Sequence, residues 1–222
     1  MNADALAMTA PAATAPDPHR PTAGDIGVWA FIAVASTLFT LFLTAYMMRM
    51  RALDWSPIAM PWQLWLSSAW LVAGSVVMHR ASRAAAARDA RRMSRLLLAG
   101  GACAVAFVAV QLWAWSSLQS ARVVLASNPA ASFFYVLTAL HGLHVLGGLV
   151  AWSSTVHGER PAPEGSPAVA TTATKPAVSD GTALRVKLCA RYWHFLLAVW
   201  LLLFAAMSQL TPDIVRAICG TA

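Results

Sequence analysis

One stretch of the chain, residues 123–158, runs for 36 residues between Arg122 and Glu159 without a formal charge. A helix needs about 20 predominantly apolar residues to cross the hydrocarbon core of a bilayer. His141 and His144 lie inside the stretch, and their spacing of three places them on one face of a helix. Ionisable side chains within a membrane usually face protein or a cavity rather than lipid. The stretch therefore predicts a membrane-spanning helix with a polar face.

The composition supports a membrane domain rather than a soluble one. The 222 residues are 59% hydrophobic and 11% charged, whereas a soluble domain carries about a quarter charged residues. The net charge of +7 does not indicate nucleic-acid binding, because most basic residues fall in two loops between apolar runs. The three cysteines have no Cys-x-x-Cys spacing, so they predict neither a disulfide framework nor a metal site.

Five apolar runs predict an all-α integral membrane bundle of five transmembrane helices within residues 26–212. Each run must be helical, because lipid offers no partner for backbone amides. The second run is the shortest, and its ends are the least defined. A disordered cytoplasmic tail (1–25), a flexible loop (157–188) and a C-terminal tail (213–222) complete the chain. The predicted spans are 26–48, 62–78, 96–118, 131–155 and 192–210.

The basic residues predict the orientation of the bundle. Of the 16 Lys and Arg residues, 12 lie in the N-terminal tail, in the loop between spans two and three, or in the loop between spans four and five. The positive-inside rule then places the N-terminus in the cytoplasm and the C-terminus in the periplasm. The Arg/Ala pattern of residues 80–95 favours helix, so the flanking helices are expected to extend beyond the membrane. This basic segment is either a solvated orientation signal or a contact for anionic lipid headgroups.

The ionisable residues argue against catalysis by the chain itself. All nine acidic residues fall outside the spans, whereas an ion-coupled transporter usually needs a carboxylate at mid-membrane. His141 and His144 share one helix face and cannot take opposite axial positions on one heme. His144 lies about 15 Å from the cytoplasmic end of its span at 1.5 Å per residue, too deep to share a metal with His194. We predict no catalytic, cofactor or metal residues, and expect the imidazoles to be packing contacts between helices.

Small and polar residues extend this packing interpretation. Gly142, Gly147 and Gly148 are expected to let another helix approach the fourth span closely. Gln111 in the third span is expected to form an interhelical hydrogen bond.

Two motifs in the last spans give the chain a specific resemblance. The fourth span resembles a helix of subunit III of the heme–copper oxidases, the cytochrome c oxidase family. It reads Phe134-Tyr135-Val136-Leu137-Thr138-Ala139-Leu140-His141-Gly142-Leu143-His144-Val145-Leu146-Gly147-Gly148. The fifth span opens with that family's Tyr-Trp-His-Phe sequence, here Tyr192-Trp193-His194-Phe195, with Trp200 following. The five-span form is similar to the shorter bacterial versions of this subunit.

The resemblance implies a non-catalytic subunit of a terminal oxidase in the bacterial inner membrane, which reduces O₂ to water with electrons from cytochrome c. Heme and copper would belong to partner subunits. This chain would pack mainly against subunit I, contact subunit II and bind phospholipid. The candidates for lipid or subunit contacts are His141, His144, His194, Tyr192, Trp193, Gln111, Gly142 and Gly147.

One departure from the family keeps other functions open. The family usually has an acid eleven residues before the Tyr of its Ala-Tyr pair, and counting back from Tyr46 reaches Ala35. That carboxylate is associated with proton handling, so its absence puts such a role for this chain in doubt. The missing acid leaves open an accessory subunit of a quinol oxidase or nitric oxide reductase. The three histidines within the spans leave open a stand-alone b-type cytochrome or small transporter.

Overall fold

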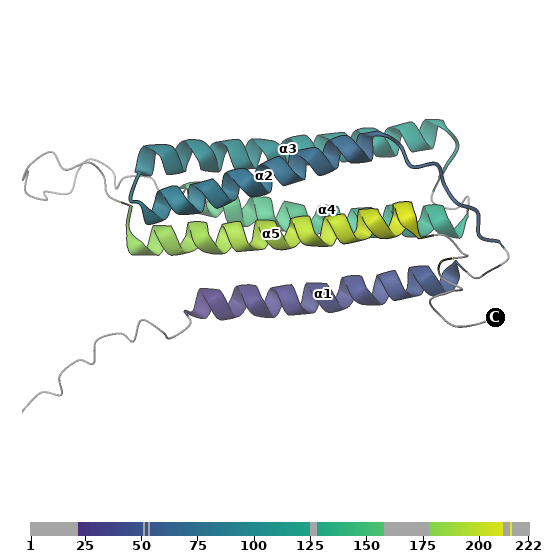
Figure 1. The fold of residues 1–222 in the computed structure, drawn as a ribbon, viewed down its shortest axis with the longest axis horizontal. Coiled ribbons are helices and arrows are strands. Elements are labelled where there is room, and N and C mark those ends of the chain that lie inside the picture. Colours follow the sequence, from purple (N-terminus) through teal and green to yellow (C-terminus); the bar gives the residue numbers. More distant parts are fainter. Residues whose placement is uncertain are drawn as a thin grey trace, which may run out of the picture.

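The computed structural model describes residues 22–50, 52, 54–124, 128–157, 178–210 and 214. Within these residues the chain is all-helical and contains no strand, which confirms the all-α part of the predicted fold class. The helices lie side by side along the long axis of the molecule (Figure 1). They are α1 (Ala23–Arg49), α2 (Gln63–Ala86), α3 (Ala90–Ser120), α4 (Pro129–His157) and α5 (Asp180–Gln209).

Four of the described helices, α1, α3, α4 and α5, have the length and apolar composition to cross a membrane. They identify the chain as a multi-pass membrane protein. The 24 residues of α2 are long enough, at about 36 Å, but its composition is more polar. Gln63, Ser67 and Ser68 make its N-terminal half more polar, and Arg80 and Arg83 add charge near its C-terminal end. A crossing by α2 is therefore not established by composition, unlike the other four.

The bundle is organised around α5. Helix α2 packs on α3 and α5, α4 packs on α5 and α3, and α1 lies at the edge against α4 and α5. The core between them holds large aromatic side chains, including Trp193, Trp200 and Phe107, each no more than 1% exposed. Glycines bring α2 and α3 together: a Cβ on Gly100 would lie 2.9 Å from the sulfur of Met78. Close approach of this kind is typical of helix pairs in membranes.

Helices α2 and α3 extend past the predicted spans, as their Arg/Ala pattern predicted. They are joined by a tight turn in which Arg88 adopts a left-handed conformation with φ of 57°. The Asp89 carboxylate accepts a hydrogen bond from the backbone N–H of Arg92 and caps α3. Asp and Asn are favoured at this position because they satisfy an otherwise unpaired helical N–H.

Two predicted boundaries are wrong. The loop predicted at 157–188 ends earlier, because α5 begins at Asp180, where the Ser179 side chain caps the first turn. Arg88 of the α2–α3 turn fixes this end by donating to the carbonyl of Val178 and to the Asp180 carboxylate. The N-terminal tail also ends earlier, because Thr22 caps α1. Residues 1–21, 158–177 and most of 211–222, where the rest of the predicted tails and loop falls, lie outside the described residues.

Candidate intersubunit and lipid site

His141 lies at the centre of the bundle rather than on its surface. It is 0% exposed and is surrounded by rings from three other helices. The ring centroids of Trp200 and Phe107 lie 5.1 and 5.7 Å away, and that of Phe39 lies 6.3 Å away. Neither of its ring nitrogens has a hydrogen-bond partner among the described residues. Its ring is enclosed by the chain itself, so we keep the prediction of a lipid or subunit contact only for more accessible residues.

His144 faces the helix at the edge of the bundle. Its ring packs against Phe31 and Phe39 of α1, at centroid distances of 5.7 and 5.2 Å. Its Nδ1 donates to the carbonyl of Leu140, with 2.7 Å between the two atoms. A carbonyl only accepts, so Nδ1 carries a proton in this bond, and Nε2 takes no part in it. Ala35, at the position where the family has an acid, is 2% exposed and lies one turn from each of these two phenylalanines.

The Tyr-Trp pair that opens the α5 motif joins α5 to α4. The Tyr192 hydroxyl donates to the carbonyl of His144 at 2.8 Å, and its ring meets Phe31 edge-on. Trp193 is 1% exposed and fills the space left by two glycines. A Cβ on Gly148 of α4 would lie 2.5 Å from its ring, and one on Gly74 of α2 would lie 3.5 Å from its Nε1. Trp193 of α5 is thus a core residue that packs against both α2 and α4.

The glycine prediction is confirmed only at Gly148. At Gly142 and Gly147, a Cβ would have no heavy atom of the described chain within 4 Å, so these two glycines remain candidates for contact with something outside the chain. Gln111 is half-buried, and its amide atoms have no hydrogen-bond partner among the described residues. The interhelical bond expected of it is therefore not seen.

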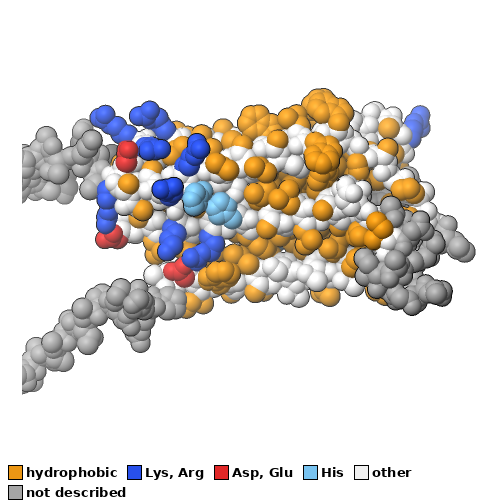
Figure 2. All heavy atoms as spheres, in the orientation of Figure 1, with side chains coloured by type: hydrophobic (Ala, Val, Ile, Leu, Met, Phe, Trp, Pro, Cys, Tyr) orange, Lys and Arg blue, Asp and Glu red, His pale blue; other side chains and the backbone are white. Residues whose placement is uncertain are grey.

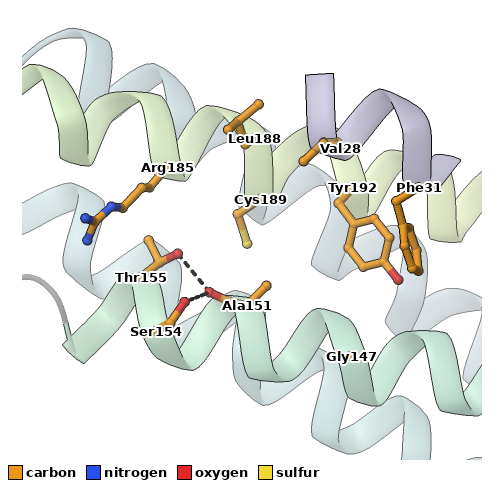
Figure 3. Close-up of a pocket in the computed structure, with 11 residues that line it drawn as sticks. Val28, Phe31, Gly147, Ala151, Ser154, Thr155, Arg185, Leu188, Cys189 and Tyr192 are labelled. Carbon is orange, nitrogen blue, oxygen red and sulfur yellow. Dashed lines mark hydrogen bonds between the residues drawn. The ribbon is translucent and has the colours of Figure 1, made fainter. Parts of the chain in front are cut away.

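A groove of about 650 Å³ separates α1 from α4 and α5. Its walls are apolar, because the hydroxyls of Ser154 and Thr155 both donate to the carbonyl of Ala151. Arg185 lies at its basic end, beside Thr155 (Figure 3). The groove thus offers a long apolar surface with a cation at one end. Its lining residues are Gly27, Val28, Phe31, Gly147, Ala151, Ser154, Thr155, Arg185, Leu188, Cys189 and Tyr192.

The basic end of α1 is tied to α5 by a charged contact. Arg191 donates to the carboxylate of Asp25 at 2.8 Å, and its guanidinium lies 5.3 Å from the ring centroid of Trp29. Both charged side chains are less than a third exposed. This contact fixes the first turns of α1 against α5.

His79 was not among the predicted site residues, because the predicted second span ends at Met78. The helix continues to Ala86, and the ring of His79 lies 5.8 Å from that of His194, centroid to centroid. His194 also shares a hydrogen bond with the Ser75 hydroxyl. The signal was available in the sequence, because Ser75 and His79 are four residues apart and share one helix face. Among the described residues, no group of three His, Cys, Asp or Glu side chains could hold a metal ion.

No family model matches the chain. Comparison with known proteins finds relatives that are all named as subunit 3 of cytochrome c oxidase. Over 188 residues it is 30% identical to cytochrome c oxidase subunit 3 of Synechocystis, covering 80% of this chain and 72% of that protein. It is 26% identical over 196 residues to the protein of the same name from Thermostichus vulcanus, covering 84% and 87%. A probable subunit 3 of Nocardia farcinica is 33% identical over 101 residues, or 46% and 43% of the two chains.

The relative from Synechocystis matches most of both chains, so the similarity is not confined to one apolar helix. It confirms the resemblance carried by the motifs around His141 and Tyr192. The chain belongs to the cytochrome c oxidase subunit III family of the heme–copper oxidases.

Proposed function

We propose that the chain is a non-catalytic subunit of a bacterial inner-membrane oxidase that reduces O₂ to water with electrons from cytochrome c. Subunit I is its main partner, subunit II is a further one, and these partners carry the heme and copper. The observation that carries the proposal is the identity of 30% over 80% of the chain to a named cytochrome c oxidase subunit 3. The chain's own contribution is shape: a core of packed aromatic rings and an apolar outer surface.

In this proposal the chain crosses the membrane five times, with its N-terminus in the cytoplasm. Figure 2 supports the orientation, because Lys and Arg gather at one end of the bundle. Helix α2 joins α3 through a turn of only a few residues, so both helices share that end. A partner subunit or α2's own packing on α3 and α5 would cover its more polar surface.

The groove between α1, α4 and α5 is the proposed phospholipid site. Its apolar walls suit acyl chains, and Arg185 at its end suits an anionic headgroup. Gly147 leaves space on the α4 wall, since no described atom lies within 4 Å of where its Cβ would be. A lipid in this groove would stabilise α1, and through it the surface offered to subunit I.

Affinity purification of the tagged full-length chain from its own membranes tests the function. We expect heme–copper subunits to copurify, and the purified complex to consume O₂ with reduced cytochrome c as donor. Oxidation of quinol instead of cytochrome c would support the quinol-oxidase alternative that the missing acid at Ala35 raises. Recovery of the chain without any heme-containing partner would refute the proposal. Phospholipid analysis of the same complex tests the lipid site, with Gly147→Leu expected to remove lipid from the groove.

A further inference from the structure

Two exposed histidines form a pair on the outer face of the bundle, away from the groove. His79 of α2 and His194 of α5 lie with their ring centroids 5.8 Å apart. Ser75, one turn before His79, is 2% exposed and shares a hydrogen bond with Nδ1 of His194. The bond turns the Nδ1 edge of that ring toward the bundle and leaves Nε2 at the surface. Two helices thus bring two imidazole rings together at the exposed surface.

The pair lies where the charged end of the bundle meets its apolar surface. Helix α2 has no charged residue before Arg80, and α5 has none after Arg191. Figure 2 shows histidine side chains at this boundary, beside the Lys and Arg of the basic end. In a bilayer, such a boundary corresponds to the headgroup region, between water and the hydrocarbon core. A ligand reaching the pair is therefore more easily a headgroup than a solute from bulk water.

The electrostatics of the surface favour an anion. Arg83 follows His79 by one helical turn, and Lys187 precedes His194 by two; both are exposed. The described acids at this end are engaged elsewhere. The Asp25 carboxylate pairs with Arg191, the Asp180 carboxylate pairs with Arg88, and the Asp89 carboxylate caps α3. Within the described chain, no acidic side chain is left to neutralise Arg83 or Lys187.

We propose that the α2–α5 surface binds the phosphate of an anionic phospholipid, with His79 and His194 as hydrogen-bond donors and Arg83 and Lys187 beside them. In this arrangement the Ser75 hydroxyl donates to Nδ1 of His194, so that Nε2 carries the outward-facing proton. A divalent cation fits less well, because it would have only two imidazole ligands in a field of positive charge. The proposal deepens the lipid binding of the proposed function, on which it rests, and assigns it a second site on another face.

Lipid competition with the full-length chain tests the site. The chain is reconstituted in nanodiscs of phosphatidylcholine containing a minor fraction of phosphatidylglycerol, and native mass spectrometry measures which lipid it retains. We expect the wild type to retain phosphatidylglycerol preferentially. The double variant His79→Ala/His194→Ala should lower this preference roughly fivefold for each hydrogen bond to the phosphate that is lost.

Two further variants separate the site from general effects of charge and folding. His157→Ala removes another exposed histidine, whose Nδ1 donates to the carbonyl of Ser153 on α4, and it should leave the lipid preference unchanged. His79→Gln/His194→Gln keeps donors but cannot become charged. It should retain part of the preference, and this variant tests the proposal if the alanine variant does not fold.

Several results would overturn the proposal. They are equal retention of the two lipids by the wild type, an unchanged preference in the double variants, and an equal loss in His157→Ala. Full displacement of phosphatidylglycerol by added inorganic phosphate would identify free phosphate as the ligand instead. Copurification of heme–copper subunits is measured separately. Its absence in the wild type would refute the oxidase role, whereas its presence with an unselective α2–α5 surface would refute only this site.

Discussion

Replacing Gly148 by Ala should destabilise the bundle, although alanine is the better helix former. The new Cβ would lie 2.5 Å from the ring of Trp193 and 2.9 Å from that of Tyr192. Ordinary contacts are about 3.5–4.0 Å, so one helix would have to shift by about 1 Å. Trp193 cannot retreat, because Gly74 of α2 already lies against its other side. Overpacking of this kind costs about 1–3 kcal/mol.

The matched control is Gly142→Ala, nearly two turns earlier on the same helix. No described atom lies within 4 Å of its Cβ position, so only the gain in helix propensity of up to about 1 kcal/mol applies. Thermal unfolding of the full-length chain in detergent, followed by circular dichroism, should therefore rank Gly142→Ala at or above the wild type and Gly148→Ala below it. Equal midpoints for the two variants would refute the argument that the indole of Trp193 fixes the distance between α4 and α5.

Three more changes test contacts that hold α1 and α4 in place. Arg191→Gln removes the ion pair with Asp25 and the cation–π contact, and should lower the free energy of unfolding by about 1 kcal/mol; no loss at low salt would contradict the role of this pair. Trp152→Phe removes a hydrogen bond to a carbonyl of α3, and should lower the unfolding free energy by about 1 kcal/mol while leaving the helix content intact. Ala35→Glu should leave the free energy of unfolding nearly unchanged if His144 pairs with the new carboxylate. When His144→Phe removes that partner, the same substitution should lower the free energy of unfolding by about 3–5 kcal/mol more. Additive unfolding free energies in that double-mutant cycle would show that the two side chains do not meet.

The sequence predicted the helices well because lipid restricts the backbone to helix wherever apolar runs are long enough. It predicted their ends less well, because ends depend on capping and on contacts outside the apolar run. Asp180 begins α5 since Ser179 caps it and Arg88 holds it, and neither contact follows from hydrophobicity. The C-terminal end of α2 was also predicted too early, because its composition becomes polar after Met78. The predicted span therefore excluded His79, which the structure places beside His194.

The candidate site was predictable in its residues but not in their exposure. The motifs marked His141, His144 and Trp193 together, yet a motif does not say which face of a helix meets the protein itself. The structure encloses His141 and Trp193 and leaves Gly142 without a neighbour among the described residues. Rings from α1, α3 and α5 enclose His141, and glycines of α2 and α4 allow Trp193 to be enclosed between these helices.

Helix α1 is the part of the bundle whose position depends most on what surrounds the chain. Its outer face carries large exposed apolar side chains, with Met48 and Val34 about 70% exposed. It is held to the bundle by the ion pair of Arg191 at one end and by the rings packed around Tyr46 at the other. Phe31 and Phe39 also pack against His144, whereas around residues 27–31 the groove lies between α1, α4 and α5. A lipid in the groove would therefore add contact where the protein itself provides little, so removal of lipid should loosen α1 before it disturbs α2, α3 and α5.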